Sequence, residues 1–198
     1  DAGIVSVTAD EPLHRCTYRE AFARSARLAN ALARLGIRPG ERIGTLAWND
    51  YRHLEVYFAT ACAGFVCHTI NPRLFPEQIE YIVGHAEDRW IFVDPAFVPM
   101  LEALKDRLGC VEGYVILGPA GSAANTSLRN AIDYETLIAG EADTFDWREL
   151  DENSACALCY TSGTTGNPKG VVYSHRALVL HTYGCLMPDV MNLSAREV

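Results

Sequence analysis

Ten consecutive residues near the end of the chain have the composition of a phosphate-binding loop. They contain four side-chain hydroxyls, three glycines and one lysine, in the order Thr161, Ser162, Gly163, Thr164, Thr165, Gly166, Asn167, Pro168, Lys169 and Gly170. Glycines let successive backbone N–H groups turn into a concavity, hydroxyls donate further hydrogen bonds, and a lysine adds positive charge. Together these groups can hold the oxygens of a polyphosphate.

The residue order separates this loop from the Walker A motif. Walker A requires a Gly-Lys pair followed by a hydroxyl residue, whereas Lys169 follows a proline and precedes Gly170. The residues from Val171 to Ser174 favour an extended strand, not a helix start facing the phosphates. We therefore predict a strand, a hydroxyl-rich loop and a second strand, with Ser174 capping a helix that begins at His175.

The rest of the chain alternates between strand-like and helix-like patterns. Thr17 and Glu20 have the spacing of a capping box at the start of a first helix. Short apolar runs indicate strands at 42–48, 66–70, 90–94 and 111–117, and helical spacing of apolar residues indicates helices between them, including 76–86, 97–108 and a short one at 133–139. This alternation predicts an α/β fold with a mostly parallel sheet flanked by helices.

Helical spacing also predicts which side chains are buried. In the second helix region the expected core stripe is Leu54, Tyr57, Phe58, Ala61 and Phe65. The arginines of the first helix, Arg19, Arg24, Arg27 and Arg34, fall mostly off its apolar stripe and are expected on a solvated face. The histidines His53, His68, His85 and His175 lack ligand spacing and are expected to pack or hydrogen bond and not to bind metal.

Composition excludes several classes of protein. A net charge of −8 argues against a surface that binds nucleic acid or an acidic membrane. The sequence contains no run of 18 apolar residues, so it predicts no transmembrane helix. Seven cysteines, an odd number, indicate reduced thiols and a cytoplasmic location. Cys156 and Cys159 are interpreted as core residues, since side chains three apart on a strand point to opposite faces.

The loop from Thr161 to Gly170 resembles the phosphate-binding signature of the adenylate-forming superfamily, which includes acyl-CoA synthetases, peptide-synthetase adenylation domains and beetle luciferases. Other segments agree in order and spacing: Thr17-Tyr18-Arg19-Glu20, Pro39-Gly40-Glu41-Arg42-Ile43 and Pro76-Glu77-Gln78-Ile79. More narrowly, the segments around Trp48 to Glu55 and Cys67 to Leu74 resemble medium- to long-chain fatty-acyl-CoA synthetases.

The resemblance implies an ATP-dependent acid–thiol ligase whose substrates are a carboxylic acid, ATP and coenzyme A. The carboxylate would attack the α-phosphorus of ATP, and the thiol of coenzyme A would then displace AMP. The residues implied to hold the β- and γ-phosphates are Thr161, Ser162, Gly163, Thr164, Thr165, Gly166 and Lys169, with Thr161 also contacting Mg²⁺.

Several motifs of these enzymes do not occur before Val198, including the Mg²⁺-binding glutamate, the ribose-binding aspartate and the lysine of the small C-terminal domain. Residues 1–198 are therefore expected to be part of the N-terminal AMP-binding domain, without catalytic residues and inactive alone. Adenylation of an aryl, short-chain or amino acid, and a non-catalytic nucleotide- or pyrophosphate-binding module, are the alternatives. Apolar residues expected to be exposed and to favour a homo-oligomer are Leu178, Leu180, Leu186 and Met187.

Overall fold

The computed structural model describes residues 3–8, 13–161 and 166–192. Within these residues a seven-stranded sheet has the order β7-β6-β5-β3-β4-β8-β9. Neighbouring strands are parallel except for the antiparallel pair β8 and β9. The strands are β3 (Arg42–Leu46), β4 (Val66–Thr69), β5 (Trp90–Val93), β6 (Gly113–Ile116), β7 (Ile132–Asp133), β8 (Ala155–Thr161) and β9 (Lys169–Ser174). The predicted α/β class is confirmed.

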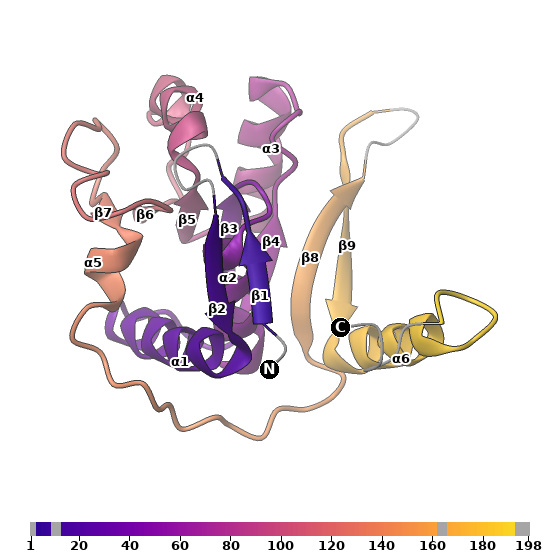
Figure 1. Cartoon of the computed structure of the whole chain (residues 1–198). Coiled ribbons are helices and arrows are strands. Elements are labelled where there is room, and N and C mark those ends of the chain that lie inside the picture. Colours follow the sequence, from indigo (N-terminus) through magenta and orange to yellow (C-terminus); the bar gives the residue numbers. More distant parts are fainter. Residues whose placement is uncertain (1–2, 9–12, 162–165, 193–198) are drawn as a thin grey trace.

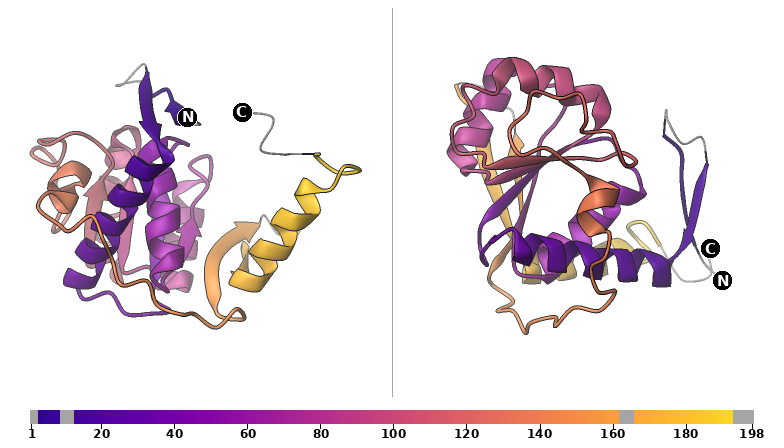
Figure 2. Two further views of the ribbon diagram at one scale, coloured as in Figure 1. Left: turned by 60° about the horizontal axis from the view of Figure 1, so that its bottom comes forward. Right: turned by 90° about the vertical axis from the view of Figure 1, so that its left-hand side faces the viewer.

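Helices cover both faces of the parallel part of this sheet (Figures 1 and 2). One layer packs α1, α2 and α5 against the sheet, and the other packs α3 and α4. The bounds are α1 (Tyr18–Arg34), α2 (Tyr51–Cys62), α3 (Pro76–Ala86), a short 3-10 helix η1 (Pro95–Phe97), α4 (Val98–Leu104), α5 (Tyr134–Ile138) and α6 (His175–Leu186). The hairpin β8–β9 and α6 extend from one edge of the sheet (Figure 1).

Strand β5 shows how the two layers share one sheet. Trp90 and Phe92 pack into the core beneath α1, α2 and α5. Ile91 and Val93 pack into the core beneath α3 and α4. Because both faces are covered, this strand is a continuous apolar run without the alternation of a half-exposed strand.

Helix ends follow the local sequence closely. The capping box is present: the Thr17 backbone N–H donates to Glu20 Oε2 at 2.7 Å, and the Glu20 N–H donates to Thr17 Oγ1 at 3.2 Å. α3 has the predicted bounds, with Pro76 in its first turn. The helix predicted over 97–108 is shorter: α4 begins at Val98, after a 3-10 turn that Asp94 caps, and it already ends at Leu104.

A short antiparallel hairpin near the N-terminus was not predicted. It pairs β1 (Gly3–Ser6) with β2 (His14–Thr17), separately from the main sheet. Each strand has four residues that alternate between exposed and half-buried, so neither presents an apolar run. The sequence signal of such a strand is weak.

The burial pattern predicted for α2 is wrong in part. Phe65, which follows the helix, is buried as expected, but Tyr57 and Phe58 are 38% and 54% exposed. The face of α2 turned to the core instead carries polar residues, including Arg52, His53 and Glu55, each at most 5% exposed. A helix with charged residues on its inner face does not show its orientation through apolar spacing.

Partners from distant parts of the chain neutralise these charges. Arg24 of α1 donates from Nε to Glu55 Oε1 at 2.8 Å, and the Tyr134 hydroxyl of α5 donates to Glu55 Oε2 at 2.6 Å. Arg24 also donates to Glu135, which in turn accepts from Arg52 Nε at 3.0 Å. Arg24 therefore joins α1, α2 and α5 and does not lie on the predicted solvated face. Its two carboxylate partners offset the cost of removing its charge from water.

Candidate functional site: the phosphate-binding hairpin and the cavity beside it

The two predicted strands on either side of the loop are confirmed as β8 and β9. The register pairs Thr161 directly with Lys169 and Tyr160 with Gly170. Two of the predicted phosphate ligands, Thr161 and Lys169, therefore face each other where the two strands meet the loop. The predicted ligands Ser162, Gly163, Thr164 and Thr165 lie outside the described residues.

The described part of the loop has the chemistry of an anion site. Thr161, Gly166 and Lys169 are all exposed, and Gly166 has a backbone φ of 99°, in the left-handed region that favours glycine. Within residues 3–8, 13–161 and 166–192, Lys169 forms no ion pair, so its charge is available to a ligand.

The helix after the hairpin does not face the loop. Ser174 caps α6, with its side chain accepting from the Ala177 N–H at 3.2 Å. The six residues of β9 lie between the loop and this helix start, a length of about 20 Å for an extended strand. An anion on the loop would thus be held by backbone N–H groups, hydroxyls and Lys169, without the helix-terminus field that a Walker loop provides.

Tyr160 connects the hairpin to the α3 layer. Its hydroxyl lies 2.6 Å from Nδ1 of His85 on α3, and its ring centroid lies 5.1 Å from that of His68 on β4. His68 shares a 2.7 Å hydrogen bond with Asp88, and both side chains are fully buried. Burial raises the pKa of Asp88, although its bond to His68 acts in the opposite direction. As predicted, these histidines serve packing and hydrogen bonding.

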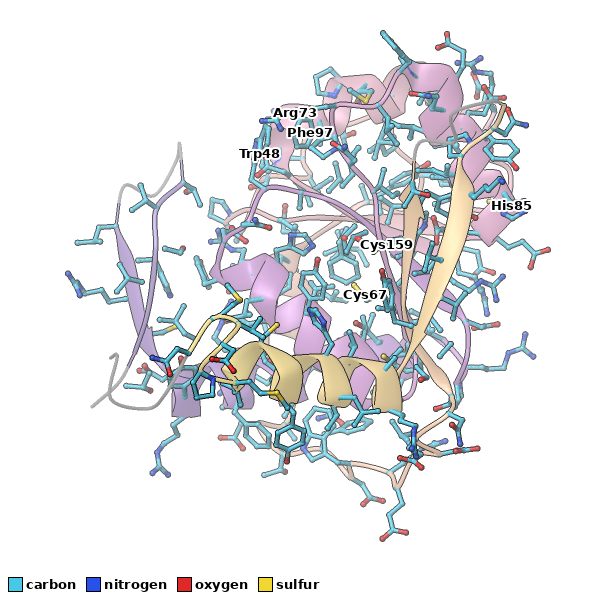
Figure 3. The ribbon with its side chains drawn as sticks, turned by 90° about the vertical axis from the view of Figure 1, so that its right-hand side faces the viewer. Trp48, Cys67, Arg73, His85, Phe97 and Cys159 are labelled. Carbon is cyan, nitrogen blue, oxygen red and sulfur yellow. The ribbon has the colours of Figure 1, made fainter. Side chains whose placement is uncertain are left out.

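A cavity of about 340 Å³ opens beside the hairpin, at the edge where the parallel strands β3, β4 and β8 end. Ligands of open α/β sheets bind at this edge. Its lining combines residues after β3 and β4 with the side chains His53, Tyr57, Thr69 and Cys159. Figure 3 labels Trp48, Arg73 and Cys159 on this side, with His85 on the far side of the hairpin.

Two polar side chains of this cavity, His53 and Tyr57, are held in neutral forms. Burial lowers the pKa of His53, whose ring nitrogens contact the Trp48 carbonyl at 3.1 Å and Thr45 Oγ1 at 3.0 Å. Burial raises the pKa of Tyr57 to about 12. Cys159 Sγ lies 3.1 Å from Thr69 Oγ1. His53 and Tyr57 can donate or accept hydrogen bonds without adding charge, whereas Arg73 brings a guanidinium to the same lining.

The prediction that Cys156 and Cys159 are both core residues is confirmed for Cys156 and wrong for Cys159. Cys156 is buried and donates from Sγ to the Tyr173 carbonyl, whereas Cys159 is half-buried and lines the cavity. All seven cysteines are free thiols. Among the described residues no group of three or more His, Cys, Asp or Glu side chains is placed to hold a metal ion.

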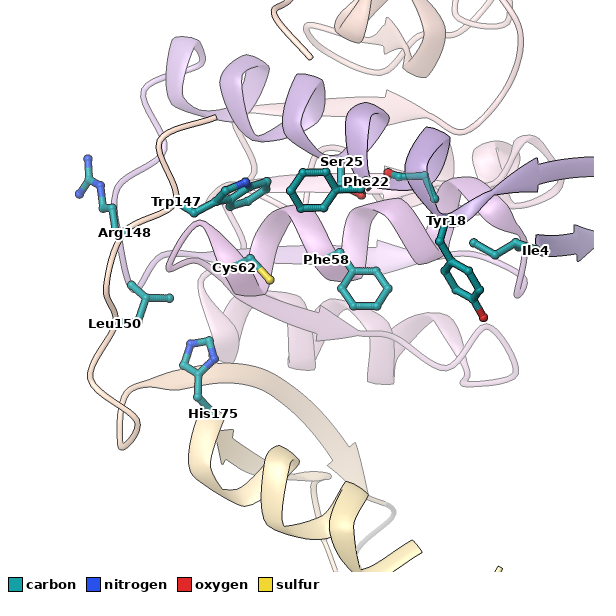
Figure 4. A pocket seen from close by; sticks show the side chains of 11 residues that line it. Ile4, Tyr18, Phe22, Ser25, Phe58, Cys62, Trp147, Arg148, Leu150 and His175 are labelled. Atoms are coloured by element: carbon teal, nitrogen blue, oxygen red, sulfur yellow. Dashed lines mark hydrogen bonds between the residues drawn. The ribbon is translucent and has the colours of Figure 1, made fainter. Parts of the chain in front are cut away.

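A larger, apolar groove of about 560 Å³ lies on the opposite side of α2 from the core (Figure 4). Phe22 of α1, Phe58 of α2 and Trp147 line it, together with His175 at the start of α6. Phe58 is thus a groove residue, although helical spacing predicted that it faces the core.

Comparison with known proteins shows which family this fold and this hairpin belong to. A sequence model described as AMP-binding enzyme matches residues 4–198. The chain belongs to the AMP-binding enzyme family. The chain is 49% identical to a 3-methylmercaptopropionyl-CoA ligase of Ruegeria lacuscaerulensis and 47% identical to a medium-chain-fatty-acid–CoA ligase of Ectopseudomonas oleovorans, covering 98% of this chain and 36% of each relative.

Solved structures of the family share the fold. The anthranilate CoA ligase AuaEII in complex with anthranoyl-AMP superposes with a TM-score of 0.77 at 26% identity, covering 90% of this chain and 32% of that one. The chain thus spans about a third of the length of the AMP-binding enzymes that it matches. Among its described residues, no helix is both long and apolar enough to cross a bilayer.

Proposed function

We propose that this chain is the phosphate-binding part of an ATP-dependent fatty acid:CoA ligase. The observation that carries the proposal is the cross-strand pairing of Thr161 with Lys169 at the mouth of a glycine- and hydroxyl-rich loop. Lys169 is exposed and forms no ion pair with the described residues. Relatives at 47% and 49% identity that are named as acyl-CoA ligases support this chemistry. In a complete ligase we place residues 1–198 in the N-terminal AMP-binding domain.

The loop would act on the first of two steps. A carboxylate oxygen of the acid forms a bond to the α-phosphorus of ATP while the bond to the β-phosphate oxygen breaks, which releases pyrophosphate. Negative charge grows on the departing β- and γ-phosphates, and donors already directed there stabilise the transition state more than the ground state. In the second step the coenzyme A thiol gives up its proton, its sulfur forms the thioester, and AMP departs.

Mg²⁺ would neutralise phosphate charge when it is bound. The Thr161 hydroxyl is a hard oxygen ligand of the kind that Mg²⁺ accepts, and it is exposed at the loop. Phosphate oxygens, water and a carboxylate commonly complete such a site. Free thiols at all seven cysteines favour a reducing compartment, and we place the ligase in the cytoplasm.

The identity of the acid is a finer question with two candidates. The 3-methylmercaptopropionyl-CoA ligase at 49% identity and the medium-chain-fatty-acid–CoA ligase at 47% identity both favour an aliphatic acid. The anthranilate ligase, at 26% identity, keeps an aryl acid as the second candidate. Pyrophosphate exchange by the complete ligase with a panel of aliphatic and aryl acids distinguishes them. Exchange with aryl acids alone would contradict the fatty-acid assignment.

Replacing Lys169 tests the role of the loop. We expect Lys169→Ala to lower the rate of ATP–pyrophosphate exchange by about 100-fold or more, the cost of losing one donor to developing charge. Its melting temperature should stay close to that of the wild type, because the side chain is exposed. The matched control is Lys105→Ala, which removes an ammonium group that donates to Ser127 Oγ at 2.9 Å. Unchanged exchange in Lys169→Ala would refute the assignment.

A further inference from the structure

The mouth of the phosphate-binding hairpin lacks the sheet support that the rest of β8 has. Parallel pairing between β4 and β8 ends at Thr69 and Cys159. Tyr160 and Thr161 continue beyond this point and pair only with β9, which is the edge strand of the sheet. The residues that carry the loop are therefore tied to the body of the protein by side chains, not by a backbone ladder on both sides.

Tyr160 supplies this tie through its hydroxyl and its ring. The hydroxyl shares the 2.6 Å hydrogen bond with His85 Nδ1, and the two rings meet edge to face with centroids 5.8 Å apart. His68 lies against the same ring and is itself fixed by Asp88 within the core. The Tyr160 ring thus packs against the buried His68, and its hydroxyl is held by His85 at the surface of α3.

The same ring sets the position of the second strand. Gly170 pairs with Tyr160 across the ladder, and a Cβ added at Gly170 would lie 3.3 Å from Tyr160 Cζ. The phenol ring therefore lies close against the β9 backbone, one residue from Lys169. A shift of the ring would move the backbone that carries the phosphate-binding charge.

We propose that Tyr160 and His85 are positioning residues that fix the mouth of the phosphate-binding loop, and with it Lys169. This inference rests on the proposed function. Neither residue needs to touch ATP, since the ring acts on the loop through Gly170 and the hydroxyl acts through α3. Misplacing a bound group by about 1 Å is sufficient to lower the rate of an enzymatic step.

Kinetics of ATP–pyrophosphate exchange by the complete ligase test this proposal. Tyr160→Phe removes only the hydroxyl, and His85→Ala removes the imidazole. We expect each change to raise the KM for ATP by about 3- to 10-fold, the effect of losing one hydrogen bond. The KM for the carboxylic acid should not change. The double variant should be no worse than either single variant, because both remove the same interaction.

Two further variants separate positioning from general stability. His85→Asn keeps a hydrogen-bonding group near the Nδ1 position and should restore a KM for ATP close to that of the wild type. Tyr134→Phe deletes another buried tyrosine bond, that to Glu55 in the opposite layer. It should lower the melting temperature and leave the KM for ATP unchanged.

The outcomes distinguish this inference from the proposed function. Active wild-type ligase with an unchanged KM for ATP in Tyr160→Phe and His85→Ala overturns the positioning role alone. Effects of these two changes that add in the double variant also contradict it. A wild-type ligase that shows no exchange with any acid overturns the proposed function, and the positioning role falls with it.

Discussion

Gly166 shows how a single residue type shapes the proposed phosphate-binding loop. Its backbone lies at a φ of 99°, and among the described residues outside its chain neighbours no atom lies within 4 Å of the position of an added Cβ. With respect to these residues, the cost of a side chain there would be conformational and not steric. For a residue other than glycine this backbone region costs about 1–2 kcal/mol.

Gly166→Ala therefore separates loop conformation from folding. We expect the KM for ATP to rise about 5- to 20-fold, because the loop must recover its geometry on binding. The melting temperature should change little, since Gly166 is exposed. Gly84→Ala is the matched control: Gly84 is an exposed glycine within α3 with open space around it. There alanine should stabilise the helix by up to about 1 kcal/mol. Equal KM values in both variants would contradict a special role for Gly166.

At the level of elements, local signals in the sequence predicted helix ends far better than helix faces. The bounds of α3 and the Ser174 cap of α6 depend on proline and hydroxyl residues within one turn, so adjacent sequence suffices. The buried face of α2 depends on Arg24 and Tyr134, which lie on other helices. No pattern within α2 shows that its Glu55 has such partners.

The candidate functional site also has a part that local sequence predicts and a part that depends on residues far apart in the chain. Composition and order identified the loop and the strand on each side of it. The tie between Tyr160 and His85 joins residues 75 positions apart in the chain. The cavity at the sheet edge combines residues from α2, β8 and the segments after β3 and β4. Only the crossovers of the parallel sheet bring these together.

Two carboxylates that share Arg24 should respond to pH in opposite directions. Burial acts to raise the pKa of Glu135, but Arg24 and Arg52 outweigh it and hold this pKa below the ordinary 4.5. For Glu55 burial prevails over Arg24 and Tyr134, and its pKa lies above 4.5. The two shifts differ because Glu135 is partly exposed and Glu55 is fully buried.

Unfolding measured across the acid range tests this contrast. The stabilisation from Glu135 is complete above pH 4.5 and is lost as the pH falls through its lowered pKa. The difference in free energy of unfolding between wild type and Glu135→Gln should therefore shrink below pH 4.5. The contribution of Glu55 is complete below pH 4.5 and is lost as the pH rises through its raised pKa. The difference in free energy of unfolding between wild type and Glu55→Gln should therefore change with pH in the opposite direction. If the two differences changed in the same direction, the opposite pKa shifts of Glu135 and Glu55 would be contradicted.

At the level of the whole molecule, the apolar surface gathers around α6. Leu178, Leu180, Leu186 and Met187 are exposed as predicted, by 39% to 57%, and Tyr183 is 63% exposed. The apolar groove of Figure 4 reaches the start of the same helix. An apolar surface of this extent favours association in water.

We expect isolated residues 1–198 to associate in a concentration-dependent manner, as measured by light scattering. Leu180→Glu combined with Met187→Glu should lower the average mass without lowering the melting temperature, because both side chains are more than half exposed. The matched control is Val5→Glu, at an exposed apolar residue of the separate N-terminal hairpin. A monodisperse monomer of the unmodified chain at high concentration would contradict this prediction.

The pairing of β8 with β4 has a consequence for the order of folding. β4 ends at Thr69 and β8 begins at Ala155, so their contact closes a long stretch of chain, whereas β3 to β6 follow one another through short crossovers. A contact between distant positions requires the intervening chain to lose conformational entropy before the contact itself contributes stability. We expect the β3–β6 core to form first and the β8–β9 hairpin to dock onto it. The proposed phosphate-binding loop would then be among the last parts to mature, and a newly made chain would gain this candidate site only once its scaffold had formed.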